Sequence, residues 1–133
     1  MIPTSDGREA RRQYRAGAVA TAPPAQLVTM MFDAALAAVA RAEQALGRDT
    51  AAPDVVARVH ADLTRAQDIV LELQLSLDHD AGGEIADSLA ALYEFCLERL
   101  VSANSRKDPR PLAAVTMVLG DLRTAWTAAT GAG

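Results

Sequence analysis

Four stretches of the chain repeat apolar residues every three or four positions, the spacing of one face of an α-helix. The first stretch follows Pro23 and Pro24 and ends before Gly47, and the second begins at Pro53. Proline is accepted in the first turn of a helix, where its missing N–H costs nothing, so these boundaries are well marked. No run alternates with the period of a β-strand. We expect helices over residues 24–46, 53–77, 84–103 and 109–126.

Each predicted helix has one apolar row that we expect to face a common core. In the second helix this row alternates regularly between steps of three and four residues, which is the spacing of helical bundles. The expected inward rows are Val28, Met31, Phe32, Ala35, Val39, Ala42 and Leu46; Val56, Val59, Leu63, Ala66, Val70, Leu73 and Leu77; Ile85, Leu89, Leu92, Cys96 and Leu100; and Leu112, Val115, Leu119, Leu122 and Trp126.

The connections between the predicted helices are short, so consecutive helices should be antiparallel neighbours. Residues 78–83 read as a turn, and Asp108 should cap the last helix with Pro109 in its first position. The predicted fold is therefore all-α, an antiparallel up-down four-helix bundle preceded by a short helical or extended segment. We divide the chain into a flexible segment 1–20, a bundle 21–128 and a disordered end 129–133.

Composition narrows the function classes. The chain has 133 residues, half of them hydrophobic, but 29 are alanine, which buries little area. The net charge of −4 argues against nucleic acid or an anionic membrane as the main partner. No apolar run approaches the ~20 residues of a membrane span, and the polar start is no signal peptide. Because Cys96 is the single cysteine, we expect a reducing cytoplasm.

Leu71 and Leu75 do not belong to the inward row of the second helix. Since residues of a helix are about 100° apart, this pair points more than about 90° away from that row. The two leucines are one turn apart and Gln67 precedes them by another turn. A second ridge of large aliphatic side chains predicts a contact surface, into which an amphipathic helix of another protein could lie. Self-association through the same ridge is the alternative.

The third helix is also apolar beyond one row, with Phe95 on one flank and Tyr93 and Leu97 on the other. Two interpretations of Phe95 and Tyr93 stay open: they broaden the core, or they extend the contact surface. We take Tyr93 and Leu97 as surface candidates beside the Leu71 and Leu75 ridge.

Catalytic and metal-binding patterns are missing from the sequence. A di-iron bundle needs Glu three residues before His, but Ala57 precedes His60 and Ser76 precedes His79 at that spacing. Cys96 lies on an inward row without a neighbouring histidine, which indicates a packed thiol. We therefore predict no enzyme, no cofactor and no metal.

Many residues match one known family in order, across about residues 13 to 126. No single motif is specific, but the ordered set is. The residues that carry the resemblance are Tyr14, Val19, Thr21-Ala22, Pro24, Leu27, Met31, Phe32-Asp33, Gln67-Asp68-Ile69, Leu73, Ser76-Leu77-Asp78, Gly82-Gly83-Glu84-Ile85-Ala86, Leu89, Leu92-Tyr93, Arg99-Leu100, Ala103-Asn104, Asp108, Val115, Leu122-Arg123 and Trp126.

The family that the chain resembles is FliS, the bacterial flagellin export chaperones. The resemblance implies a cytosolic chaperone without ATPase activity. Such a chaperone binds the disordered C-terminal segment of new flagellin, prevents early polymerisation and supports delivery to the flagellar type III export gate. It also implies that the N-terminal segment around Tyr14 covers part of the hydrophobic surface until the client replaces it.

The candidate site follows from the ridge and the resemblance together. We expect a client groove along the second and third helices, no nucleic-acid partner and no stable membrane insertion, with a weak homodimer as a further option. The candidate groove residues are Leu71, Leu75, Tyr93 and Leu97 as apolar contacts and Gln67 and Asn104 as polar partners, with Tyr14 as the cover.

Overall fold

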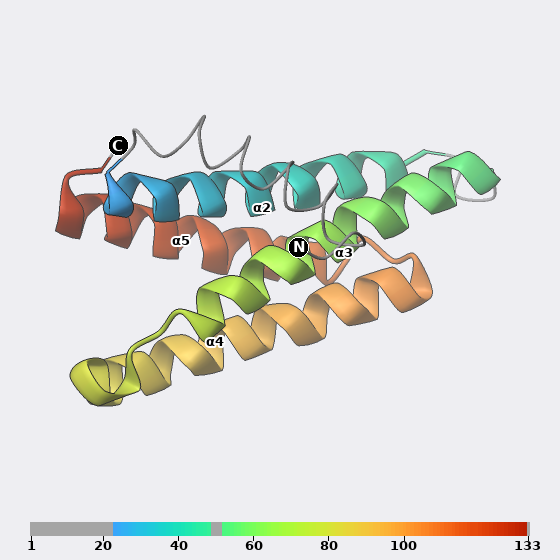
Figure 1. Cartoon of the computed structure of the whole chain (residues 1–133). Coiled ribbons are helices and arrows are strands. Elements are labelled where there is room, and N and C mark those ends of the chain that lie inside the picture. Colours follow the sequence, from blue (N-terminus) through green and yellow to red (C-terminus); the bar gives the residue numbers. More distant parts are fainter. Residues whose placement is uncertain (1–22, 49–51, 133) are drawn as a thin grey trace, which may run out of the picture.

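The computed structural model describes residues 23–48 and 52–132 and confirms the all-α prediction. The expected N-terminal segment 1–20 and its cover residue Tyr14 lie outside the described residues. No strand occurs in the part of the chain that is described. The described helices, seen in Figure 1, are α2 (Pro24–Leu46), α3 (Pro53–Leu75), α4 (His79–Arg106) and α5 (Leu112–Thr130).

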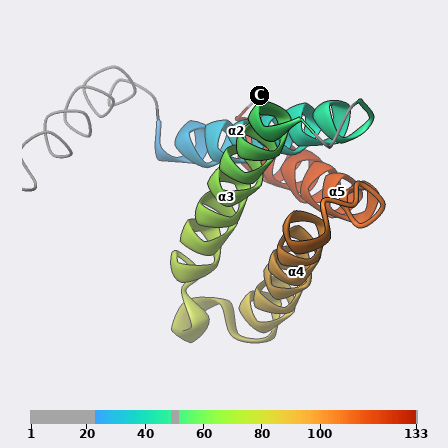
Figure 2. The ribbon, with the colours of Figure 1, turned by 90° about the vertical axis from the view of Figure 1, so that its right-hand side faces the viewer.

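The helices form a four-sided bundle in which α2 packs against α3 and α5, and α4 packs against the same two helices. Figures 1 and 2 show α2 and α5 running side by side, with the α3–α4 hairpin crossing them. The connected end of this hairpin projects away from α2 and α5. Side chains near the α3–α4 connection therefore have fewer neighbours than those in the middle of the bundle.

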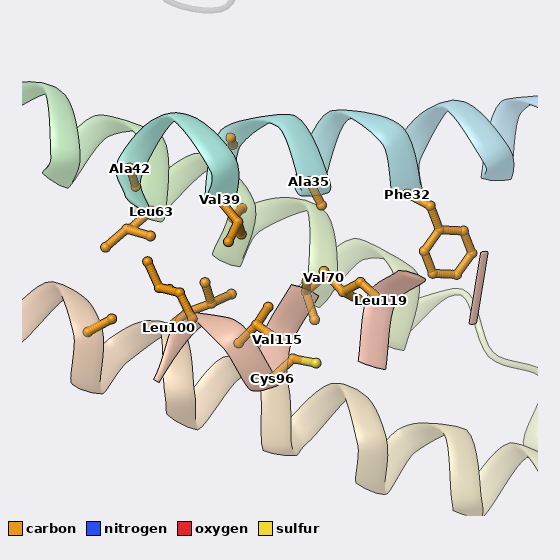
Figure 3. Packing of buried hydrophobic residues seen from close by; sticks show 14 of the residues in the cluster. Phe32, Ala35, Val39, Ala42, Leu63, Val70, Cys96, Leu100, Val115 and Leu119 are labelled. Carbon is orange, nitrogen blue, oxygen red and sulfur yellow. The ribbon is translucent and has the colours of Figure 1, made fainter. Parts of the chain in front are cut away.

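The core lies where all four helices meet (Figure 3). Leu63, Leu100, Leu112 and Leu119 are its largest fully buried side chains, one or two from each of α3, α4 and α5. The α2 helix contributes mainly small residues, which let its backbone approach its neighbours closely. The buried residues of α2 are Thr29, Phe32, Ala35, Ala38, Val39, Ala42 and Leu46.

The start of α4 differs from the predicted turn over residues 78–83. The side chain of Asp78 accepts a hydrogen bond from the backbone N–H of Ala81 at 3.0 Å, so one helical turn begins at His79. Gly83 then interrupts the helix with φ 52° and ψ −124° before it continues to Arg106. The segment predicted as a turn therefore contains one helical turn, and the glycine that the sequence offers at position 83 forms the kink that follows it.

The last helix begins and ends later than expected. The Asp108 carboxylate accepts from the backbone N–H of Arg110 at 2.9 Å and pairs with its guanidinium, and α5 starts only at Leu112. At the other end α5 continues to Thr130 and Gly131 closes it with φ 72°. Residues 129 and 130 are thus helical, although the sequence placed them in a disordered end over 129–133.

Contacts between distant segments fix this C-terminal end. The indole N–H of Trp126 donates to the carbonyl of Ala25 at 2.7 Å, and the hydroxyl of Thr29 lies 3.3 Å from the carbonyl of Ala132. These contacts join the end of α5 to the first turns of α2, so the two helices stay paired along their length.

One described helix, α2, is long and apolar enough to cross a membrane by length and composition. The sequence prediction that no apolar stretch reaches this length therefore needs correction. A helix that packs one face in a protein core and carries many alanines meets the same criterion. Phe32, Val39 and Leu46 of α2 are buried against the rest of the bundle.

Candidate functional site

An open groove of about 640 Å³ lies along α3 and α4. Its apolar part is formed by Leu97 and Val101 of α4, and Gln67 of α3 lines it from the other side. Glu94, Glu98 and Arg106 also line it. We call this hollow the α3–α4 groove. Two of the predicted site residues, Gln67 and Leu97, come together in it.

Leu71 and Leu75 follow Gln67 on successive turns of α3, and both are exposed: 44% of Leu71 and 76% of Leu75 is accessible. Their buried neighbours Val70 and Leu73 point into the core instead. The predicted exposure of this leucine pair is confirmed. Because residues four apart lie on one face of a helix, the leucines continue the line that Gln67 begins.

Tyr93, predicted as part of the contact surface, lies in the core instead: only 5% of it is exposed, and it belongs to the core cluster. Burial raises the pKa of its hydroxyl, and the nearby Cys96 adds to the shift. Of the two interpretations left open by the sequence, the structure favours the core for Tyr93. Phe95 is half-buried against the core, with the guanidinium of Arg99 stacked 4.9 Å from its ring centre.

Asn104 is engaged within the bundle. Its side-chain oxygen accepts from the Nζ of Lys107 at 2.7 Å, and its amide nitrogen lies 3.1 Å from the Nδ1 of His60. Lys107 ends α4 in the left-handed conformation, with φ 51°, which turns its side chain back over the last turn. Each of these contacts uses only part of the capacity of the Asn104 amide, since its nitrogen carries two N–H groups and its oxygen two lone pairs.

Polar contacts hold α3 and α4 together at two levels. Near the projecting end the amide of Gln74 donates to the carbonyl of Ala90 at 3.4 Å, and near the other end Asn104 meets His60. Gln67 and Leu97 lie between these two contacts in sequence on their helices. The spacing between the groove walls is thus fixed on both sides of the groove by hydrogen bonds as well as by packing.

Two side chains expected in the core are exposed. Ile85 is 72% accessible and Leu92 is 39% accessible, so the predicted inward row of α4 is wrong at these two positions. The other end of that row is confirmed, since Cys96 and Leu100 are buried, together with Ala86, Tyr93 and Ala103. The sequence does contain a signal that Ile85 and Leu92 are exposed, because the next residue on their row, seven positions after Leu92, is the charged Arg99.

No chemically reactive centre stands out in the described residues. Burial raises the pKa of the Cys96 thiol to about 11, which keeps it protonated at neutral pH. No group of three or more His, Cys, Asp or Glu side chains within residues 23–48 and 52–132 is placed to hold a metal ion.

Comparison with known proteins gives one consistent result. Residues 7–132 match the family described as flagellar protein FliS. The flagellar secretion chaperone FliS of Salmonella typhimurium is 38% identical over 125 residues, covering 92% of this chain and 89% of that protein. The protein of the same name in Bacillus subtilis is 33% identical over 113 residues, covering 85% and 80%.

The chain belongs to the FliS family. The match includes every described helix and both walls of the α3–α4 groove. Membership of FliS supports the role of a flagellar secretion chaperone, and it confirms the resemblance that the sequence carries. The family match does not identify the residues that contact a client, so these are inferred from the groove.

Proposed function

We propose that this chain is a cytosolic export chaperone that binds the disordered C-terminal segment of flagellin. The client lies as an amphipathic helix along the α3–α4 groove, with apolar side chains against Leu71, Leu75 and Leu97. Binding prevents premature polymerisation, and the complex is delivered to the export gate of the flagellar type III apparatus. The observation that carries this proposal is the exposed leucine pair beside the groove in a FliS-family chain.

The energetics suit a temporary complex. Full burial of a leucine contributes roughly 1.5–3 kcal/mol, and both ridge leucines begin largely exposed. A disordered client loses roughly 2–5 kcal/mol of this gain when it becomes ordered. The same cost that limits affinity keeps the complex reversible, which a chaperone that must release its client requires.

The N-terminal segment remains part of the proposal. Tyr14 and residues 1–20 lie outside the described residues, and their role as a cover that the client replaces stays a prediction. Removing residues 1–20 should therefore tighten client binding, because the client no longer competes with the cover.

The test is titration calorimetry with a peptide of the last ~40 residues of flagellin from the same cell, long enough for more than one helix of groove length at ~1.5 Å per residue. The double variant Leu71→Glu/Leu75→Glu should lose binding while its helicity and melting stay close to wild type. Met117→Glu is the matched control, since Met117 is 66% exposed on α5, outside the groove. It should bind the peptide normally.

Two results would count against the proposal. Collapse of the fold in the Leu71→Glu/Leu75→Glu variant would return both leucines to the core. A dimer on a sizing column that ignores added flagellin peptide would favour the alternative, a self-associating bundle that uses the same ridge without a client.

A further inference from the structure

The α3–α4 hairpin carries charges of a single sign over a long stretch. Between residues 66 and 98 the chain has eight Asp and Glu residues and no Lys or Arg. The whole chain has 17 acidic and 13 basic residues, so the other 100 residues hold nine acidic and 13 basic ones. The stretch 66–98 therefore contributes −8 and the rest +4, which together give the net charge of −4.

Some of these carboxylates lie beside the apolar contact surface. Glu94 and Glu98 line the α3–α4 groove, and Asp68 and Glu72 are exposed on α3 next to Leu71 in sequence. Among the described residues, no Lys or Arg nitrogen comes within 4.0 Å of any of these four carboxylates. The surface thus combines exposed leucines with carboxylates whose charge has no close partner in the described part of the bundle.

The nature of this surface restricts its occupant. A purely apolar segment would partly desolvate carboxylates without supplying a counter-charge, which is unfavourable. A second copy of the chain would bring another stretch of eight negative charges against the first, and like charges repel. A segment with both apolar and cationic side chains satisfies the leucines and the carboxylates together.

We propose that the α3–α4 groove selects a cationic amphipathic helix, in which Lys or Arg side chains flank the apolar face. The cationic side chains lie toward the α3–α4 connection, against Glu94 and Glu98, because Arg106 lines the groove at its other end. The inference deepens the proposed function and rests on it: it assigns the client a charge pattern in addition to an apolar face.

The experiment measures binding of the full chain to the flagellin C-terminal peptide by calorimetry, at low salt and at high salt. The groove variant is Glu94→Gln/Glu98→Gln. The matched control is Glu43→Gln/Asp121→Asn, which removes the same charge from exposed positions on α2 and α5. Because the groove variant loses two exposed ion pairs, it should bind about three- to fivefold more weakly at low salt. The control should stay within about twofold of wild type, since neither Glu43 nor Asp121 lines the groove.

The outcomes separate the two proposals. Equal affinity of the groove variant and the control would overturn the charge inference and leave the client assignment standing. A peptide with its Lys and Arg residues replaced by Gln that binds as tightly as the original would also overturn it. A wild-type chain that does not bind the original peptide would overturn the proposed function itself. A dimer that tightens in the groove variant would show that a second copy occupies the surface, again overturning the inference.

Discussion

Replacement of Gly83 by alanine tests how α4 is built. Gly83 has φ 52° and ψ −124°, a combination that only glycine adopts readily, because a Cβ atom would collide with its own backbone. No other atom lies within 4 Å of the position where a Cβ would be added. Any effect of the substitution therefore comes from backbone strain alone, without a steric clash with the rest of the bundle.

The expected magnitude follows from this backbone strain. A non-glycine residue held in such a region costs of order 1–3 kcal/mol. Gly120 provides the opposite case: it lies inside α5, and a Cβ there would also meet nothing within 4 Å. Alanine is favoured over glycine in a helix interior by about 0.5–1 kcal/mol. Gly83→Ala should therefore destabilise the fold, whereas the same change at Gly120 should stabilise it.

Urea unfolding followed by circular dichroism measures both variants. With a slope of about 2 kcal/mol per molar urea, a loss of about 2 kcal/mol lowers the midpoint by roughly 1 M. The Gly120→Ala midpoint should rise by a few tenths molar on the same reasoning. If Gly83→Ala were as stable as wild type, residue 83 could not hold the conformation described, and α4 would run without a kink from its start.

Three further predictions concern side chains of α4. Ile85→Ala should cost under about 1 kcal/mol because Ile85 is 72% exposed, whereas Leu100→Ala should cost about 2–5 kcal/mol because Leu100 is fully buried; urea midpoints measure both, and equal losses would contradict the assigned inward face. The Cys96 thiol should react with a disulfide reagent at neutral pH only as fast as the bundle opens, and rapid labelling of the native chain would contradict its burial. Since folding raises the pKa of Cys96 from 9.0 to about 11, its contribution to stability should be complete below pH 9 and lost as the pH rises through 11, a loss absent from Cys96→Ala.

The ends of the helices could be predicted where the signal is local. The α2 helix runs from Pro24 to Leu46 as expected, because a proline and a glycine set its two ends without help from distant residues. Asp108 shows the limit of such signals. Its carboxylate accepts the backbone N–H of Arg110, but this hydrogen bond belongs to a turn that precedes the helix. The helix begins only at Leu112.

The periodicity of α4 predicted its inward face correctly at Cys96 and Leu100 and wrongly at Ile85 and Leu92. The rows through Ile85 and through Ala86 both begin with two apolar residues, and they differ only at the third step, where the first reaches Arg99 and the second Leu100. The pairing of the end of α5 with the start of α2, where Trp126 bonds to Ala25, could not be predicted in this way. A contact between residues 101 positions apart has no trace in a local pattern.

The same distinction applies to the candidate site. The exposure of Leu71 and Leu75 follows from the angle between them and the buried row of their own helix, which any straight helix preserves. The hydrogen bonding of Asn104 involves His60, which is 44 residues earlier in the sequence. The two side chains meet only because α3 and α4 are antiparallel. Polar partners of a groove are thus harder to predict than its apolar ridge, since hydrogen bonds within the fold, such as that between Asn104 and His60, join residues distant in sequence.

The apolar and the charged features of the hairpin have one physical cause in common. The end of the hairpin projects from α2 and α5, and Leu71 and Leu75 point away from the buried row of α3, so no helix covers them. A projecting apolar surface would promote aggregation, and a high density of like charge around it keeps copies of the chain apart. The same carboxylates that oppose self-association attract a cationic segment. Discrimination between a second copy and a client then requires no conformational change in the bundle, because both the repulsion and the attraction arise from fixed charges on α3 and α4.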